Sequence, residues 1–279
     1  MPVETAEPSA DYPSLLRLER ERLLDLLASV EDVDWARPTQ CPAWDVAGLC
    51  RHLLGDDLYV LSLARDGHQG TTPPPGLDEA GFIAWLDRLQ MDWVAAARRV
   101  SPRLVVELLS WLGPHVAEAF EQMDLLAVDA DVSWASDHPV PQWLEAAREV
   151  SEYWIHRQQL LTALGYPTDL RADLLGPILD AFRWAYAYRL ASVDAAPGAT
   201  VRIDVSGAVE RRWRIVRGDR WDFAEDSAGD VVAVARLDAD QAWRLLTNNL
   251  DRNAVLDITG DPAVVDVLRR TRAIIGTPE

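Results

Sequence analysis

The chain has 279 residues, which suits one large domain or two domains of ordinary size. Its formal net charge of −18 argues against the basic surface that binds nucleic acid and against docking on an anionic membrane. All of the basic side chains are Arg. Chemistry that needs a lysine (a Schiff base, a P-loop or a lysine general base) is therefore excluded.

Cysteine content and apolar runs indicate where the protein works. The only cysteines, Cys41 and Cys50, are too few for a disulfide framework and form no CxxC motif. The first residues lack the basic and apolar stretches of a secretory signal. No apolar run reaches the roughly 18 residues that span a bilayer. We expect a cytoplasmic protein, monomeric or homodimeric, with small-molecule partners and no nucleic-acid or membrane partner.

The first two-thirds of the chain have the pattern of an all-helical region. Apolar residues recur at helical spacing, and proline-rich or polar segments separate the runs. Short connections between long amphipathic helices are typical of a bundle. The predicted helices cover residues 13–30, 45–66, 78–100, 102–123, 142–164 and 171–192.

The pattern changes after residue 195, where alternation of apolar and polar residues begins. It predicts an α+β region with a largely antiparallel sheet. We therefore expect two domains, a helical one over residues 1–194 and an α+β one over 195–279. The predicted strands are 201–205, 213–216, 222–224, 231–235 and 254–258, and the predicted helices are 240–250 and 261–275.

One spacing points to chemistry. Glu152 and His156 lie four apart on a predicted helix and so share a face. His52, beside the buried stripe of another helix, could lie opposite them. Two imidazoles and a carboxylate would leave a divalent metal with an open position. From spacing alone two alternatives stay open: Arg148 or Arg157 neutralises Glu152, or Glu152 lies on the exposed face of an ordinary amphipathic helix.

Longer motifs carry a family resemblance. Residues 35–55 (WARPTQCPAWDVAGLCRHLLG) and 151–159 (SEYWIHRQQ) resemble the two N-terminal signatures of the mycothiol-dependent maleylpyruvate isomerase family, within the DinB/YfiT-like metalloenzymes. Residues 234–247 and 257–261 are similar to that family's sterol-carrier-like C-terminal domain. The chain departs from the pattern at Ala43 (usually Gly), Gly48 (usually Asp) and Gln159 (usually Asp). These departures leave the substrate and the thiol partner open.

The resemblance implies a mainly α fold, a DinB-like four-helix bundle followed by a sterol-carrier-like α+β domain. It places the family's metal ligands on His52, Glu152 and His156, with Zn²⁺ as the usual metal, although other divalent metals suit the same donors. It also implies the low-molecular-weight thiol mycothiol as cofactor and, with the lysine-free composition, an actinobacterial source.

The leading hypothesis is a zinc-dependent, mycothiol-using isomerase or S-transferase that acts on a small, maleylpyruvate-like electrophile. A metal would hold the thiol as thiolate, which adds to a conjugated cis double bond and leaves after rotation, or stays in a conjugate. Arg244 and Arg252 are the candidate catalytic residues, as carboxylate binders, and surface arginines are the alternative. Trp44 and Trp154 are candidate walls of the cofactor pocket, with core packing as the alternative.

Two other classes of function stay open at this point. One is a metal-dependent hydrolase or biosynthetic enzyme that uses no thiol, since an open zinc site also activates water. The other is a non-catalytic carrier of an apolar ligand, for which the C-terminal domain would hold the ligand.

Overall fold

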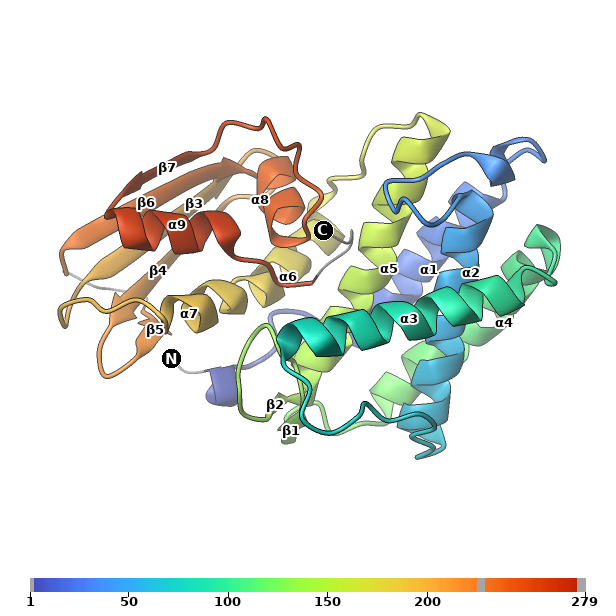
Figure 1. Cartoon of the computed structure of the whole chain (residues 1–279), viewed down its shortest axis with the longest axis horizontal. Coiled ribbons are helices and arrows are strands. Elements are labelled where there is room, and N and C mark those ends of the chain that lie inside the picture. Colours follow the sequence, from blue (N-terminus) through green and yellow to red (C-terminus); the bar gives the residue numbers. More distant parts are fainter. Residues whose placement is uncertain (1–2, 225–228, 275–279) are drawn as a thin grey trace. The chain divides into compact units, whose positions relative to one another are not determined.

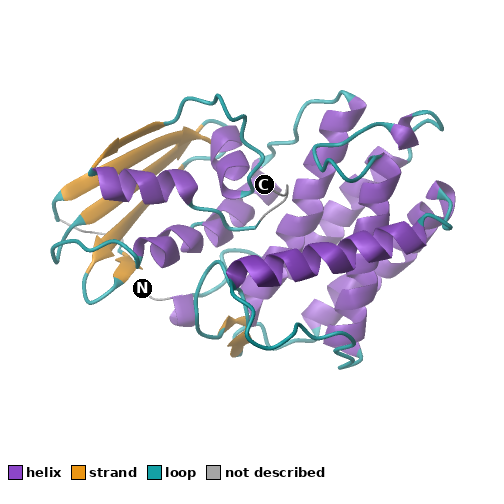
Figure 2. Cartoon of the chain, in the orientation of Figure 1, coloured by secondary structure: helices purple, strands orange, loops and turns teal. Residues whose placement is uncertain are grey.

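The computed structural model describes residues 3–224 and 229–274. The described chain is a helical region followed by an α+β region, as the sequence predicts (Figures 1 and 2). It divides into two compact units: Pro13–Met123 with His156–Thr168, and Met1–Tyr12 with Asp124–Ile155 and Asp169–Glu279. The division falls inside one continuous helix, and the predicted domain boundary near residue 195 stays a prediction.

The helical region carries the elements that the periodicity predicts. They are α1 (Tyr12–Leu27), α2 (Val46–Val60) continued by the π-helical turn η3 (Leu61–Arg65), α3 (Glu79–Ala97), α4 (Pro102–Glu121) and α5 (Gln142–Leu164). The structure adds short 3₁₀ turns η1 (Val3–Thr5) and η2 (Asp34–Ala36) and a small two-stranded pair, β1 (Val128–Ala130) with β2 (Val140–Pro141). Elements of two or three residues are too short to show a period. None of the described helices is long and apolar enough to cross a membrane.

Local signals in the sequence fix where these helices begin and end. Asp45 caps α2 by accepting a hydrogen bond from the Gly48 N–H at 2.7 Å. Asp78 caps α3 in the same way, through the Gly81 N–H at 2.8 Å. Beyond α5, Gly165 adopts the left-handed conformation (φ +83°) that stops a helix. The helices that carry the candidate site are therefore set largely by local sequence.

The predicted helix 171–192 is in fact two, α6 (Ala172–Phe182) and α7 (Trp184–Leu190). The Tyr186 N–H bonds to the Arg183 carbonyl at 3.0 Å, a three-residue step that interrupts the four-residue ladder. The guanidinium of Arg183 lies over the rings of Trp184 and Phe223, at 5.1 and 4.9 Å from their centroids. The interruption thus coincides with a packing contact that periodicity does not reveal.

The α+β region is built on one five-stranded sheet. Its strands are β3 (Thr200–Ser206), β4 (Arg211–Arg217), β5 (Trp221–Phe223), β6 (Val231–Asp238) and β7 (Asp257–Gly260), in the order β5-β4-β3-β6-β7. Only the pairing of β3 with β6 is parallel among these strands, so the predicted largely antiparallel sheet is confirmed. Helices α8 (Ala239–Leu246) and α9 (Pro262–Arg270) complete the region.

Alternation along the strands separates a buried face from an exposed one. Val201, Ile203 and Val205 of β3 are buried, whereas Arg202 and Asp204 between them are half-buried. Helices α7, α8 and α9 pack on strands of the sheet, and Figure 1 shows α9 lying along the strands. The core of this region therefore lies between the helices and one face of the sheet.

The last predicted strand, 254–258, lies at 257–260 instead. Asp251 accepts a hydrogen bond from the Asn253 N–H at 2.7 Å, and its carbonyl accepts one from the Ala254 N–H at 2.9 Å. This turn holds the first predicted strand residues out of the sheet. The closing helix ends at Arg270, and residue 275 of the predicted helix lies outside the described residues.

Candidate metal centre

The two candidate histidines come from facing helices. His52 lies on α2 beside Leu49 and Leu53, which are fully buried, and is itself only 5% exposed. His156 lies on α5 and is 3% exposed. Their Nε2 atoms are 3.1 Å apart, and the rings meet edge to face. The structure thus brings together two imidazoles that are 104 residues apart in the sequence.

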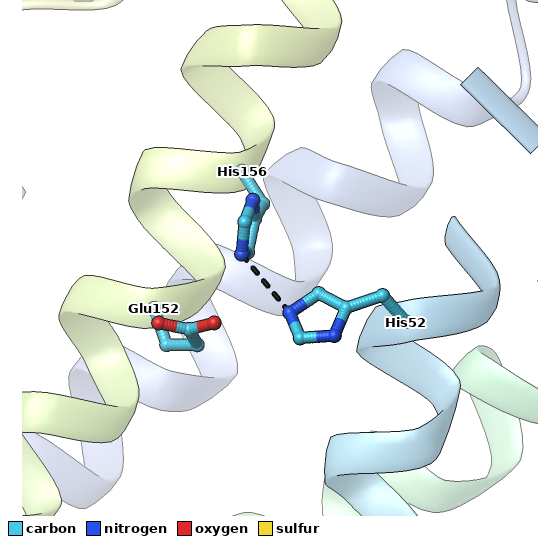
Figure 3. A group of neighbouring side chains, drawn as sticks. All are labelled: His52, Glu152 and His156. Carbon is cyan, nitrogen blue, oxygen red and sulfur yellow. Dashed lines mark hydrogen bonds between the residues drawn. The ribbon is translucent and has the colours of Figure 1, made fainter. Parts of the chain in front are cut away.

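Glu152 completes the predicted set. It precedes His156 by one helical turn of α5 and is half-buried. One ligand atom from each of the three residues lies within 4.8 Å of the others. Figure 3 shows the carboxylate and both imidazoles pointing toward one another. The three residues that the sequence singles out therefore form a cluster that could hold a metal ion.

The ring of His52 is held by α3. Its Nδ1 lies 3.1 Å from Gln90 Oε1, and Gln90 Nε2 donates to Asp56 Oδ1 at 3.2 Å. A carboxylate only accepts, so the Gln90 amide must turn its NH₂ group to Asp56 and its carbonyl to His52. Nδ1 of His52 is then a protonated nitrogen. Nε2 of His52 lies 3.1 Å from both His156 Nε2 and Asp56 Oδ2, so it faces acceptors that a cation or a proton would satisfy.

A second glutamine holds His156. Its Nδ1 lies 2.7 Å from Gln159 Oε1, which also accepts a hydrogen bond from the Cys41 thiol at 3.3 Å. Gln159 is fully buried and Cys41 nearly so. A carbonyl oxygen between two donors again assigns the proton to Nδ1 and leaves Nε2 as an acceptor.

The donor set fits a divalent transition metal. Two acceptor nitrogens at 3.1 Å repel one another unless a cation or a proton lies between them. Zinc–nitrogen bonds of about 2.0–2.1 Å at a tetrahedral angle place two ligand nitrogens about 3.3 Å apart, close to the observed separation. Imidazoles and a carboxylate are ligands for zinc and its neighbours in the first transition row. The residues present therefore fit the metal that the family resemblance implies.

Charges near Glu152 are balanced along α5. Burial alone would lower the pKa of Arg148, but Glu145 and Glu149 outweigh it and hold that pKa well above its ordinary value, and Glu152 adds to their effect. Arg148 bonds Glu145 at 2.9 and 2.7 Å and Glu149 at 3.1 Å. The other candidate partner of Glu152, Arg157, is bound to Glu19 instead, at 2.5 and 2.8 Å.

Asp56 and Asp57, which follow His52 on α2, have different partners. Asp56 Oδ2 lies 3.1 Å from His52 Nε2, so Asp56 is next to the cluster. Asp57 is fully buried and binds Arg20 of α1 through both carboxylate oxygens, at 2.9 and 2.6 Å. Asp57 therefore stabilises the bundle rather than the cluster.

The two candidate tryptophans, Trp44 and Trp154, have different contacts. Trp44 stacks on His52, with ring centroids 4.7 Å apart and planes 24° apart, and so borders the cluster. Its indole nitrogen is buried and has no hydrogen-bond partner among the described residues. Trp154 is fully buried and packs edge to face against Trp243 of α8, at 5.1 Å. Trp154 thus has a packing contact in the structure, whereas Trp44 contacts His52 of the cluster.

The candidate arginines lie in the α+β region. Arg244 on α8 donates to Asp240 at 2.8 Å and lies over the Trp243 ring at 4.5 Å. Arg252 is exposed in the loop after α8. Neither is placed at the cluster by a described contact, and their catalytic roles stay predictions.

Both cysteines are buried thiols. Cys50 is completely buried, and this burial raises the pKa of its thiol to about 12. Cys41 is engaged with Gln159. The remaining histidines are exposed (His68 and His138) or half-exposed (His115).

A depression of about 430 Å³ in the α+β region is lined by none of the candidate site residues. Asp194, Asp230 and Asp261 are among the residues that line it. Three carboxylates do not suit an apolar ligand, so this depression gives no support to the carrier hypothesis.

The chain is thus a helical protein with a candidate metal site on facing helices, followed by an α+β region. A family model described as the mycothiol maleylpyruvate isomerase N-terminal domain matches residues 16–161. The chain belongs to this family and is an enzyme. All three residues of the cluster lie inside the matched segment.

Two solved structures share the fold of nearly the whole chain. They are a mycothiol-dependent maleylpyruvate isomerase and a variant of it with a histidine-to-alanine substitution. Each matches with a TM-score of 0.55 and 15% identity, over 94% of this chain and 97% of the solved one. No curated protein sequence matches the chain.

The structure adds two residues to the site that the sequence does not assign to it. Gln90 has no local pattern to mark it, because it is 38 residues from His52 on another helix. Gln159 stands out in the sequence only as a departure from the family pattern. Its contact with His156 is three residues along one helix, a spacing that the sequence does contain.

Proposed function

We propose that this enzyme uses a divalent metal, with zinc as the favoured candidate, to activate mycothiol for attack on a small electrophile. The observation that carries the proposal is the His52–Glu152–His156 cluster, inside the segment matched by the family model. The reaction is the cis–trans isomerisation of a maleylpyruvate-like substrate, or transfer of the thiol to it. The names of the family and of the similar structures support mycothiol and the isomerase activity.

The three side chains would hold the metal through two Nε2 atoms and one carboxylate oxygen. When bound, zinc lowers the pKa of a coordinated thiol, and a thiolate adds reversibly to a conjugated double bond or remains in a conjugate. Three protein ligands leave a position for this thiol, as in catalytic rather than structural zinc sites.

The neighbouring residues shape the space in which the thiol and substrate would meet. Trp44 covers one face of the His52 ring and offers its indole N–H as a donor beside the cluster. Burial of both histidines limits water at the site, which favours attack by sulfur over hydrolysis. We assign the carboxylate-binding role to Arg252 before Arg244, because Arg244 is already paired with Asp240.

The experiment compares turnover with and without the thiol. Purified protein loaded with zinc is mixed with maleylpyruvate, with or without mycothiol, and the products are separated by chromatography. We expect the trans isomer or a thiol conjugate only when mycothiol is present. His156→Ala should reduce the rate at least about 100-fold, because removal of a metal ligand empties the site.

His115→Ala is the matched control, since His115 lies on α4 with its side chain 41% exposed. It should leave the rate unchanged. Turnover that is equally fast without mycothiol would reject the thiol mechanism in favour of the hydrolase hypothesis. Mycothiol-dependent turnover that survives in His156→Ala would reject the cluster as the site.

A further inference from the structure

The Nδ1 atoms of His52 and His156, on the side of each ring away from the cluster, have the same kind of hydrogen-bond partner. The acceptor opposite each Nδ1 is the side-chain carbonyl of a glutamine, Gln90 for His52 and Gln159 for His156. Metal-binding histidines commonly have a carboxylate, a backbone carbonyl or water in this place. Here both outer partners are neutral side-chain amides from different helices.

We propose that Gln90 and Gln159 are positioning residues that act through the two histidines. Each holds a proton on Nδ1 of its imidazole and so keeps Nε2 as the nitrogen that faces the cluster. Each also does so without adding negative charge behind the ring. This inference rests on the proposed function for the metal but not on the identity of the substrate.

The orientation of Gln90 is determined by its own partner. Asp56 accepts a hydrogen bond from the Gln90 NH₂ group at 3.2 Å. If the amide rotated to offer an N–H to His52, its carbonyl oxygen would face the Asp56 carboxylate, and two acceptors repel one another. The Trp93 indole of α3 donates a hydrogen bond to the Arg51 carbonyl of α2 at 2.7 Å, which fixes the position of α3 along α2. Helix α3 thus holds a polar group against a ring nitrogen of α2.

The orientation of Gln159 is determined by Cys41. The Cys41 thiol donates to the same oxygen that accepts from His156 Nδ1, so both neighbours of that oxygen are donors. The two glutamines therefore differ in one testable way. A negative charge would be accommodated at position 159, between two donors, but not at position 90, opposite Asp56.

The lack of charge on the Gln90 and Gln159 amides affects how tightly the two histidines would hold a metal. A carboxylate behind an imidazole raises the basicity of the ligand and tightens metal binding, whereas an amide polarises the ring less. The metal then keeps more of its positive charge for the remaining position, where the thiol would bind. With amides behind both rings, the two histidines would hold a metal less tightly, and a bound metal would lower the pKa of a thiol more strongly.

The test measures zinc affinity by competition with a chromophoric chelator, with circular dichroism to verify folding. Gln90→Met and Gln159→Met keep the side-chain length but remove the acceptor, and we expect each to weaken zinc binding about 10-fold or more. We expect Gln159→Glu to tighten zinc binding by about tenfold. Gln90→Glu should not tighten it, because Asp56 faces the new carboxylate.

Gln122→Met is the matched control, since Gln122 is exposed at the end of α4. Dissociation constants of both Met variants within about twofold of this control would overturn the proposal. Tightening by Gln90→Glu equal to that by Gln159→Glu would overturn it as well. If Gln159→Met does not fold, the contrast between the two Glu variants decides.

Nitrogen-15 NMR of histidine-labelled protein provides a readout that a merely structural role would not move. We expect a proton on Nδ1 of both His52 and His156, with and without zinc, and its partial loss from His52 in Gln90→Met. An unprotonated Nδ1 in the wild-type protein would reject the proposal. Because the tautomers are measured without metal too, failure of wild-type protein to bind zinc would count against the proposed function separately.

Discussion

The buried ion pair beside the cluster leads to the most quantitative prediction about stability. Glu19 of α1 and Arg157 of α5 are bonded through two parallel hydrogen bonds of 2.5 and 2.8 Å, and their side chains are 0% and 3% exposed. Glu19→Gln would leave the guanidinium buried without its counter-charge. Removing one partner of such a pair costs about 3–5 kcal/mol. Two charge-assisted hydrogen bonds at about 1.5–3 kcal/mol each give a similar range.

The assay is urea unfolding followed by circular dichroism. Glu19→Gln should lower the free energy of unfolding by about 3–5 kcal/mol, whereas the double variant Glu19→Leu with Arg157→Met should recover most of the loss. Glu107→Gln is the control, because its pair with Arg103 is exposed and worth at most about 1 kcal/mol. A loss below about 1 kcal/mol in Glu19→Gln would refute the reasoning.

Two further predictions concern α2. Burial raises the pKa of Cys50 to about 12, whereas the unfolded thiol ionises near 9.0, so the unfolded state loses its proton first as the pH rises. The free energy of unfolding should fall by about 1.4 kcal/mol per pH unit above pH 9 from this thiol, and urea titrations of Cys50→Ala should lack that part of the slope. A Cβ on Gly55 would lie 2.4 Å from the Trp93 indole nitrogen. Gly55→Ala should therefore destabilise the protein by about 1–3 kcal/mol and change tryptophan fluorescence, and an unchanged spectrum and stability would contradict this packing.

Much of the fold can be predicted because its signals are local. The helix Gln142–Leu164 has the bounds that the sequence predicts, since prolines precede it and Gly165 follows it. The division of the helix at Arg183 is not predictable in this way. It coincides with a contact to Phe223 on a later strand, which no short window of sequence contains.

The candidate site is predictable in part for the same reason. Glu152 and His156 share a helix face, and the family motif adds His52, so the sequence alone is enough to assemble the cluster. Gln90 cannot be found in this way, because its contact depends on how α3 lies against α2, a matter of tertiary packing. The place of Trp154 also depends on packing. It lies two residues after Glu152 and so faces the other side of α5, against Trp243.

The measurement that tests the central claim most directly is the metal content of the purified protein. The protein is incubated with zinc, passed through a desalting column and analysed by mass spectrometry of the metal. We expect one zinc ion per chain in wild-type protein and in the His115→Ala control, and none in His156→Ala or Glu152→Gln. Folded wild-type protein without stoichiometric metal, or retention of the ion in His156→Ala, would contradict the assignment of the site.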